Sequence, residues 1–177
     1  MTKGMKILES GLEFLVSENE LFHIESYVRS ARLGIKTVEF VWLANKECEM
    51  RFIEAKSSAP RKSDDEEKRQ NLKKYIEEIS EKWLSSVQIM ACNSLSRLRL
   101  PDCPFEPRNW ESLTIKLYLV LGNEFKREWC PSLQDAFNAD ENLKKWRKIW
   151  SPKYPEWIKV LNKDSAQKLG LLSNGAK

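Results

Sequence analysis

The sequence predicts a mixed α/β (α+β) fold in which helices flank a mixed central β-sheet. Short runs of branched and aromatic residues, typical of strands, alternate with longer segments whose apolar residues recur at helical spacing. Their order along the chain is strands, helix, strand, helix, strand, which places the helices against a sheet. With 177 residues, of which 41% are hydrophobic, residues 1–177 are expected to form a single domain with its own core.

The first sixty or so residues contain strands and one ambiguous segment. Leu12 to Val16 is a short apolar run bounded by turn residues, and a second run covers Leu21 to Glu25. Either a strand or a short helix fits this second segment as far as Gly34. Thr37 to Leu43 (TVEFVWL) and Met50 to Lys56 (MRFIEAK) are separated by a few polar residues, so we expect them to form a β-hairpin.

A long helix is predicted next. Ser63 to Glu66 (SDDE) fits a capping box, and its acidic side chains suit the positive end of a helix dipole. Apolar residues then recur at helical spacing to about Leu98, with a break near Asn93. The three prolines from Pro101 to Pro107 predict a loop, and the run Leu113 to Leu121 (LTIKLYLVL) predicts a buried strand.

The C-terminal part predicts one more helix and one more strand. Ser132 can cap a helix that continues to Trp150, before Pro152 stops it. Trp157 to Leu161 (WIKVL) predicts a short strand, and residues 162–177 are expected to form a basic C-terminal tail.

The formal net charge of +4 is distributed unevenly. The segment from Asn142 to Lys177 has nine basic and two acidic residues, a net +7, whereas the first 141 residues carry a net −3. A basic region of this kind can meet a polyanion. The predicted nucleic-acid-binding residues are four cations of one helix: Lys144, Lys145, Arg147 and Lys148. The alternative interpretation is a solvated helix face, with Trp146 and Trp150, four residues apart, on the core side of the same helix.

Other features limit the classes of protein to consider. The longest apolar runs are far shorter than the ~20 residues of a membrane span, and the N-terminus has no apolar signal core, so we expect a cytoplasmic protein with no membrane partner. The four cysteines are scattered and only one histidine, His23, is present, so the sequence does not predict a zinc site. Scattered thiols suit a reducing compartment.

Three ionisable residues lie in the predicted hairpin, where apolar residues would be usual. Side chains alternate along a strand, so Glu54 and Lys56 share one face at a separation of about 7 Å. If the hairpin turns at Lys46 and Glu47, then Glu39 faces Glu54 across the strand pair. Two opposed carboxylates on an apolar face either share a proton or bind a cation, and oxygen ligands favour Mg²⁺ or Mn²⁺. A surface ion pair of Glu54 and Lys56 is the alternative interpretation.

These residues resemble a known pattern. Glu39 on one strand, Glu54-Ala55-Lys56 on the next and a long helix after them resemble the PD-(D/E)xK nuclease superfamily, which has the restriction-endonuclease-like core. The resemblance implies that Glu39 and Glu54 are catalytic Mg²⁺ (or Mn²⁺) ligands and that Lys56 assists the attack of water on a phosphodiester. Val38 stands where the superfamily has proline, and Glu39 where it has aspartate.

Some superfamily members add an acid from the N-terminal element, and Glu25 is the candidate third metal ligand here; Glu13 is interpreted as a solvated carboxylate. His23 lies on the same face as Glu25 if their segment is a strand, but a lone histidine is more often structural.

Two functions follow as hypotheses. One is a metal-dependent endonuclease or exonuclease acting on DNA, and the other is a catalytically inactive nuclease-fold module that binds nucleic acid or a protein partner. The small size of the chain favours a homodimer or a larger complex, because a single site cuts one strand.

Overall fold

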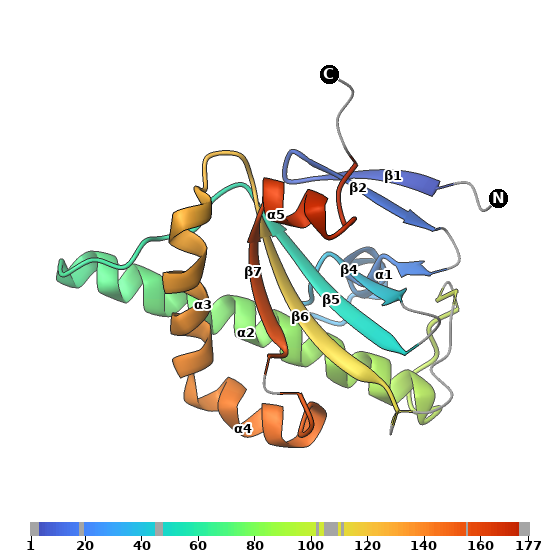
Figure 1. The fold of residues 1–177 in the computed structure, drawn as a ribbon. Coiled ribbons are helices and arrows are strands. Elements are labelled where there is room, and N and C mark those ends of the chain that lie inside the picture. Colours follow the sequence, from blue (N-terminus) through green and yellow to red (C-terminus); the bar gives the residue numbers. More distant parts are fainter. Residues whose placement is uncertain are drawn as a thin grey trace.

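A five-stranded mixed sheet forms the centre of the computed structural model (Figure 1). The structure describes residues 4–17, 20–44, 48–101, 103–104, 110, 112–154 and 156–173. Neighbouring strands are antiparallel in the first two pairs of this sheet and parallel in the last two. In spatial order the strands are β3 (Leu21–Phe22), β4 (Phe40–Ala44), β5 (Glu49–Lys56), β6 (Thr114–Leu121) and β7 (Ile158–Asn162). The predicted mixed sheet with flanking helices is therefore confirmed.

The predicted hairpin register is also confirmed. Leu43 faces Met50 and Val41 faces Phe52 across β4 and β5. Continuing this pairing by one residue beyond Phe40 places Glu39 opposite Glu54. The predicted turn residues, Lys46 and Glu47, lie outside the described residues.

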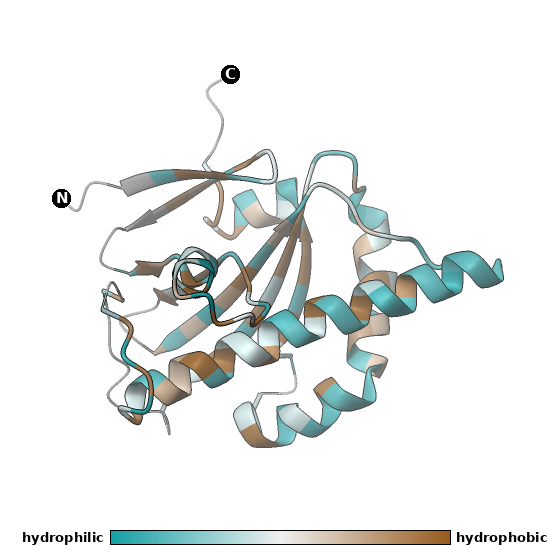
Figure 2. Ribbon diagram, turned by 180° about the vertical axis from the view of Figure 1, so that it is seen from behind, coloured by the Kyte–Doolittle hydropathy of each residue, from teal (hydrophilic) through white to brown (hydrophobic). Residues whose placement is uncertain are grey.

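Four helices cover one face of the sheet: α1 (Ile24–Ser30), α2 (Glu66–Ser94), α3 (Cys130–Ala139) and α4 (Glu141–Trp150). A 3-10 turn, η1 (Arg127–Trp129), leads into α3. Trp83 of α2 and Phe137 of α3 are fully buried against each other, with ring centroids 5.0 Å apart. Figure 2 shows α2 crossing the sheet, with a hydrophilic N-terminal part that extends beyond it. None of the helices described is long and apolar enough to cross a bilayer.

The other face is covered by a hairpin of β1 (Gly4–Glu9) and β2 (Leu12–Ser17) and by α5 (Lys163–Lys168). The prediction of a tail over 162–177 was wrong for residues 162–173. Leu171 and Leu172 are buried, the Leu15 amide donates to the Leu171 carbonyl at 3.2 Å, and Phe14 forms a bridge with Leu172. Apolar side chains that follow α5 therefore anchor the chain to the hairpin, and residues 174–177 lie outside the described residues.

Local capping explains where the helices differ from prediction. The ambiguous segment after Leu21 is a two-residue strand followed by helix α1. The single helix predicted from Ser132 to Trp150 is two helices, because the Asp140 side chain accepts a hydrogen bond from the Leu143 amide at 2.8 Å and starts α4. Helix α2 is capped in the same way by Asp65, two residues after the predicted Ser63.

Candidate active site

The end of β5 carries the charged residues of the candidate site. Glu54 and Lys56 alternate with residues of the opposite face, so they share the side of the sheet that α2 covers, together with Met50 and Phe52. Ala55 points to the other face, where its carbonyl accepts a hydrogen bond from Ser10 at 3.0 Å. The predicted sharing of one face by Glu54 and Lys56 therefore holds.

Glu54 is fully buried and is held by two lysines. Its Oε1 atom lies 2.6 Å from Nζ of Lys82 and 3.0 Å from Nζ of Lys56. Lys82 comes from the middle of α2 and is itself buried. The sequence analysis missed Lys82, although a signal was present: this lysine lies on the buried stripe of the helix, three residues after Ile79 and four before Ser86.

Glu39 lies just before β4 and is only 7% exposed. Burial, a hydrogen bond with Glu25 and the charge of Glu54 raise the pKa of Glu39 to about 8. Burial also disfavours charge on Glu25, but the hydrogen bond with Glu39 and the guanidinium of Arg29, 3.1 Å away, outweigh it and lower the pKa of Glu25. The proton shared by the two carboxyl groups therefore resides on Glu39 at neutral pH.

Lys56 stays positively charged in this setting. Burial lowers the pKa of Lys56, but the charge and hydrogen bond of Glu54 and the charge of Glu39 outweigh burial, and the net shift is upward. Lys56 can therefore act as a fixed cation that donates hydrogen bonds, and it is a poor general base.

The remaining predicted acids and His23 are placed apart from this cluster or in another role. Glu25 is on helix α1, so it does not share a strand face with His23, as had been considered. The His23 ring packs near Phe40, with centroids 5.9 Å apart, which fits a structural role. Glu13 is on β2, on the opposite side of the sheet, where it pairs with Lys6 at 2.9 Å.

Oε2 of Glu54 and the hydroxyl of Tyr75 are among the buried polar atoms that have no hydrogen-bond partner in the described part of the chain. Burial and the charge of Glu54 raise the pKa of Tyr75 far above its usual value, so the hydroxyl remains protonated. Unsatisfied buried polar atoms are costly and are uncommon in native proteins. Their presence here indicates a place where a water molecule or a ligand is expected.

A pocket lies beside this cluster, lined by Glu25 and Lys82, which contact Glu39 and Glu54 respectively. It has a volume of about 440 Å³, and Glu25, Thr37 and Lys82 contribute to its wall. The other charged groups that line it are all cationic: Arg29, Arg32 and Lys36. Arg29 pairs with Glu25 and Lys36 with Glu81, so Arg32 is the lining cation without an ion pair among the described residues and is best placed to meet an anionic group.

The residues of the candidate site fit Mg²⁺ or Mn²⁺ if water and substrate supply the remaining metal ligands. Within the described ranges, no three histidine, cysteine or acidic side chains are grouped so that they could hold a metal ion by themselves. Mg²⁺, however, commonly binds one or two carboxylates and completes its shell with water and substrate phosphate. Glu39 and Glu54 supply two opposed carboxyl groups, and Oε2 of Glu54 is without a partner in the described part of the chain. Glu25, the predicted third ligand, is engaged with Glu39.

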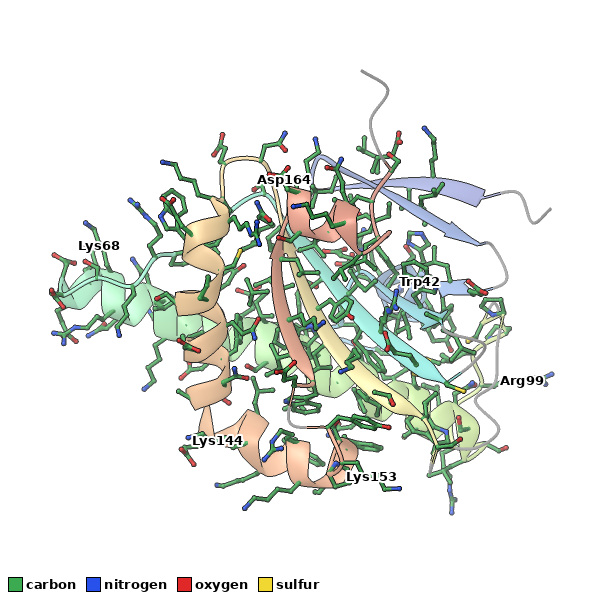
Figure 3. The ribbon with its side chains drawn as sticks, viewed as in Figure 1. Trp42, Lys68, Arg99, Lys144, Lys153 and Asp164 are labelled. Atoms are coloured by element: carbon green, nitrogen blue, oxygen red, sulfur yellow. The ribbon has the colours of Figure 1, made fainter. Side chains whose placement is uncertain are left out.

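The structure does not bring the predicted nucleic-acid-binding residues of α4 to this site. Lys144 and Arg147 lie beside the start of β7, and Trp150 beside the start of β6. Lys56, in contrast, pairs with Leu121 at the end of β6. Figure 3 shows Lys144 and Lys153 at the end of the sheet opposite Asp164 of α5, which follows the end of β7. Trp146 and Trp150 pack partly against the core, as the alternative interpretation expected.

Comparison with known proteins gives no family assignment: no family model matches the chain, and no curated protein or solved structure matches it significantly.

Proposed function

We propose that this protein is a metal-dependent nuclease that hydrolyses phosphodiester bonds of DNA. The observation that carries the proposal is that Glu39, Glu54 and Lys56, which the sequence pattern had singled out, lie in one largely buried cluster beside a pocket with cationic side chains. Lys56 lies 3.0 Å from Glu54, and the charges of Glu54 and Glu39 both act on it. Strongly perturbed ionisable groups in a cleft are typical of functional sites.

Each side chain has a role in this proposal. Glu39 and Glu54 would hold Mg²⁺ or Mn²⁺, which when bound supplies Lewis-acid polarisation of the phosphoryl group. Glu39 must lose its proton to bind the metal ion, and the negative charge that remains on its carboxylate would then lie beside the cation. Lys56 donates hydrogen bonds to a phosphate oxygen and stabilises the negative charge that develops on it. Lys82, 2.6 Å from Oε1 of Glu54, fixes the orientation of that carboxylate.

A specific observation favours the second candidate, a nuclease-fold module that binds nucleic acid or a protein without catalysis. Two lysines, Lys56 and Lys82, already compensate the charge of Glu54, and Glu39 retains its proton, so the cluster needs no metal ion to neutralise its carboxyl groups. Such a network can be purely structural.

The experiment that decides between them is cleavage of plasmid and oligonucleotide DNA with Mg²⁺ or Mn²⁺. We expect Glu54→Ala and Lys56→Ala each to lower the rate by about a hundredfold or more. Glu141→Ala and Lys168→Ala, which change exposed residues elsewhere, are the matched controls and should cleave like the wild type. Cleavage that survives both site substitutions, or no cleavage with either metal, would overturn the nuclease proposal.

A further inference from the structure

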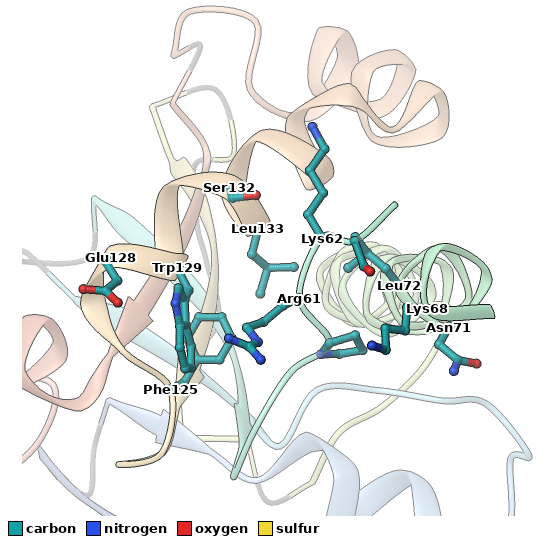
Figure 4. Close-up of a pocket in the computed structure, with 12 residues that line it drawn as sticks. Arg61, Lys62, Lys68, Asn71, Leu72, Phe125, Glu128, Trp129, Ser132 and Leu133 are labelled. Carbon is teal, nitrogen blue, oxygen red and sulfur yellow. The ribbon is translucent and has the colours of Figure 1, made fainter. Parts of the chain in front are cut away.

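A second pocket, separate from the one above Glu54, lies between the segment that follows β5, the start of α2 and the η1–α3 region (Figure 4). Its volume is about 560 Å³, within the range of about 300–1,000 Å³ typical of ligand sites. Three cations (Arg61, Lys62 and Lys68) and two aromatic residues (Phe125 and Trp129) line it, and Asn71 and Ser132 add polar groups to the wall.

The charge of this pocket is strongly positive. Arg61, Lys62 and Lys68 contribute three cations, whereas Glu128 is the single acidic residue in its lining. Figure 4 shows the carboxylate of Glu128 on the other side of the Trp129 ring from Arg61. None of the three cations forms an ion pair with an acidic residue of the described chain, whereas Arg69 and Lys73 nearby on α2 do. Uncompensated cations around a concave surface favour an anionic ligand.

Aromatic rings provide the other wall. Phe125 and Trp129 meet edge to face with centroids 5.5 Å apart, and Cζ of Arg61 lies 4.5 Å from the Trp129 ring. A guanidinium that stacks on an aromatic face keeps its edge N–H groups available for a phosphate. Cations next to aromatic rings are the combination that single-stranded nucleic acid uses, since phosphates take the charge and unstacked bases pack on the rings. An acidic peptide would use the charge but not the rings.

The pocket is close to the candidate active site along the chain. Arg61 follows Lys56 by five residues, so at most about 18 Å separates their Cα atoms. Backbone hydrogen bonds also connect the aromatic wall to Lys56: the Gly122 amide donates to the Lys56 carbonyl at 2.9 Å, and the Phe125 amide donates to the Gly122 carbonyl. A side chain at Gly122 would meet the Ser57 carbonyl at 2.7 Å, so only glycine permits this close approach.

We infer that this pocket binds a nucleotide of a single-stranded segment that flanks the phosphate to be cleaved. Arg61 and Lys62 bind the phosphate, and the base packs against the partly exposed Trp129, which the buried Phe125 supports from behind. The inference rests on the proposed nuclease function for the identity of the flanking strand. It adds a substrate class, single-stranded or frayed DNA, that the carboxylate and lysine cluster does not specify.

The test is equilibrium binding of a short fluorescein-labelled oligothymidylate (about six nucleotides) in EDTA, where no cleavage occurs. We expect Arg61→Glu to weaken binding about tenfold or more, and Lys62→Ala to reduce the slope of log affinity against log salt by about 0.7. Lys168→Glu is the control, because it makes the same charge change at an exposed residue on the other face of the sheet. Arg61 is exposed, so its variant should unfold like the wild type.

Each outcome supports or overturns the inference. Equal loss of affinity in Arg61→Glu and Lys168→Glu would show a general charge effect and overturn it. Competition by a polyglutamate peptide as effective as unlabelled oligothymidylate would indicate an acidic peptide ligand instead, and competition by inorganic phosphate at equal concentration would remove the role of the base. If the wild type binds the strand through Arg61 but never cleaves DNA, the pocket stands and the nuclease proposal fails. If the wild type cleaves DNA and Arg61→Glu binds the strand normally, the nuclease proposal stands and the inference about the pocket fails.

Discussion

The two ends of the central sheet use charge in opposite ways. At the end of β5, Glu54 is fully buried and Lys82 is 11% exposed at its side chain, so their interaction is shielded from solvent. At the other end, Lys144 of α4 pairs with Glu141, but these side chains are 49% and 75% exposed. An exposed pair contributes little to stability, whereas removing one partner of a buried pair leaves a charge without compensation. Similar residue types therefore have very different consequences in the two places.

The largest effect that tests this comparison is expected from Lys82→Met. The substitution removes the closer of the two cations that hold the buried Glu54 carboxylate, and we expect a loss of about 3 kcal/mol in the free energy of unfolding. The value lies at the lower end for broken buried pairs, because Lys56 remains. Urea unfolding followed by circular dichroism measures it.

Lys36→Met is the matched control, because Lys36 forms an exposed ion pair at 2.9 Å with Glu81, which lies on the same helix as Lys82. We expect it to cost less than about 1 kcal/mol. The double variant Glu54→Gln, Lys82→Met should lose less than the sum of the two single variants, since the charge that needs compensation is gone. Equal losses in Lys82→Met and Lys36→Met would contradict the contrast between the buried and exposed pairs.

A second prediction concerns pH and Glu39. With a folded-state pKa of about 8 against an ordinary value of 4.5, folded Glu39 retains a proton that the unfolded chain releases between these pH values. The wild type should therefore become less stable as pH rises through this window, by at most about 1.4 kcal/mol per pH unit. Glu39→Gln keeps the neutral form at every pH, so its stability relative to the wild type should increase from pH 5 to pH 8.

Glu141→Gln provides the comparison from the exposed end of the sheet. The side-chain hydrogen bond with Lys144 lowers the pKa of Glu141, so this group is ionised in both states across the same window. Its effect on stability should not change with pH there. Parallel stability curves for the wild type and Glu39→Gln from pH 5 to pH 8 would show that Glu39 does not hold a proton.

The local part of the site could be predicted from the sequence, and the long-range part could not. The period of two along a strand and the short polar connection were enough to predict Glu39 opposite Glu54 with Lys56 beside it. The register of β4 and β5, which ends at Phe40 and Ile53, continues to that pair. Lys82 is 28 residues from Glu54, and their contact depends on how α2 crosses the sheet, which no local pattern contains. Its position on the apolar stripe of α2 marked it only as unusual.

The same distinction applies to the fold. Long elements with strong periodicity, such as α2 and β6, were predicted close to their observed bounds. Helix α1 has seven residues, too few to show a helical period, and the break between α3 and α4 depends on a single side chain, Asp140. The packing of Leu171 and Leu172 on the first hairpin joins opposite ends of the chain, so residues 162–173 had resembled a tail.

The smallest effect is expected from the exposed end, in Lys145→Glu combined with Lys148→Glu. Both side chains are in solvent, so the free energy of unfolding should change by no more than about 0.5 kcal/mol per substitution.

The same double variant tests which ligands reach α4. Strands β5 and β6, each of eight residues and about 25 Å long, separate α4 from Lys56. A strand of about six nucleotides held near Arg61 should therefore bind the variant within about twofold of the wild type. A duplex of about 40 base pairs can reach both ends, so its affinity should fall severalfold and its salt dependence should weaken. Anisotropy titrations at two salt concentrations measure both ligands. If the short strand loses as much affinity as the duplex, α4 belongs to the primary binding surface, and the division of charge between the two ends of the sheet does not describe how the protein meets nucleic acid.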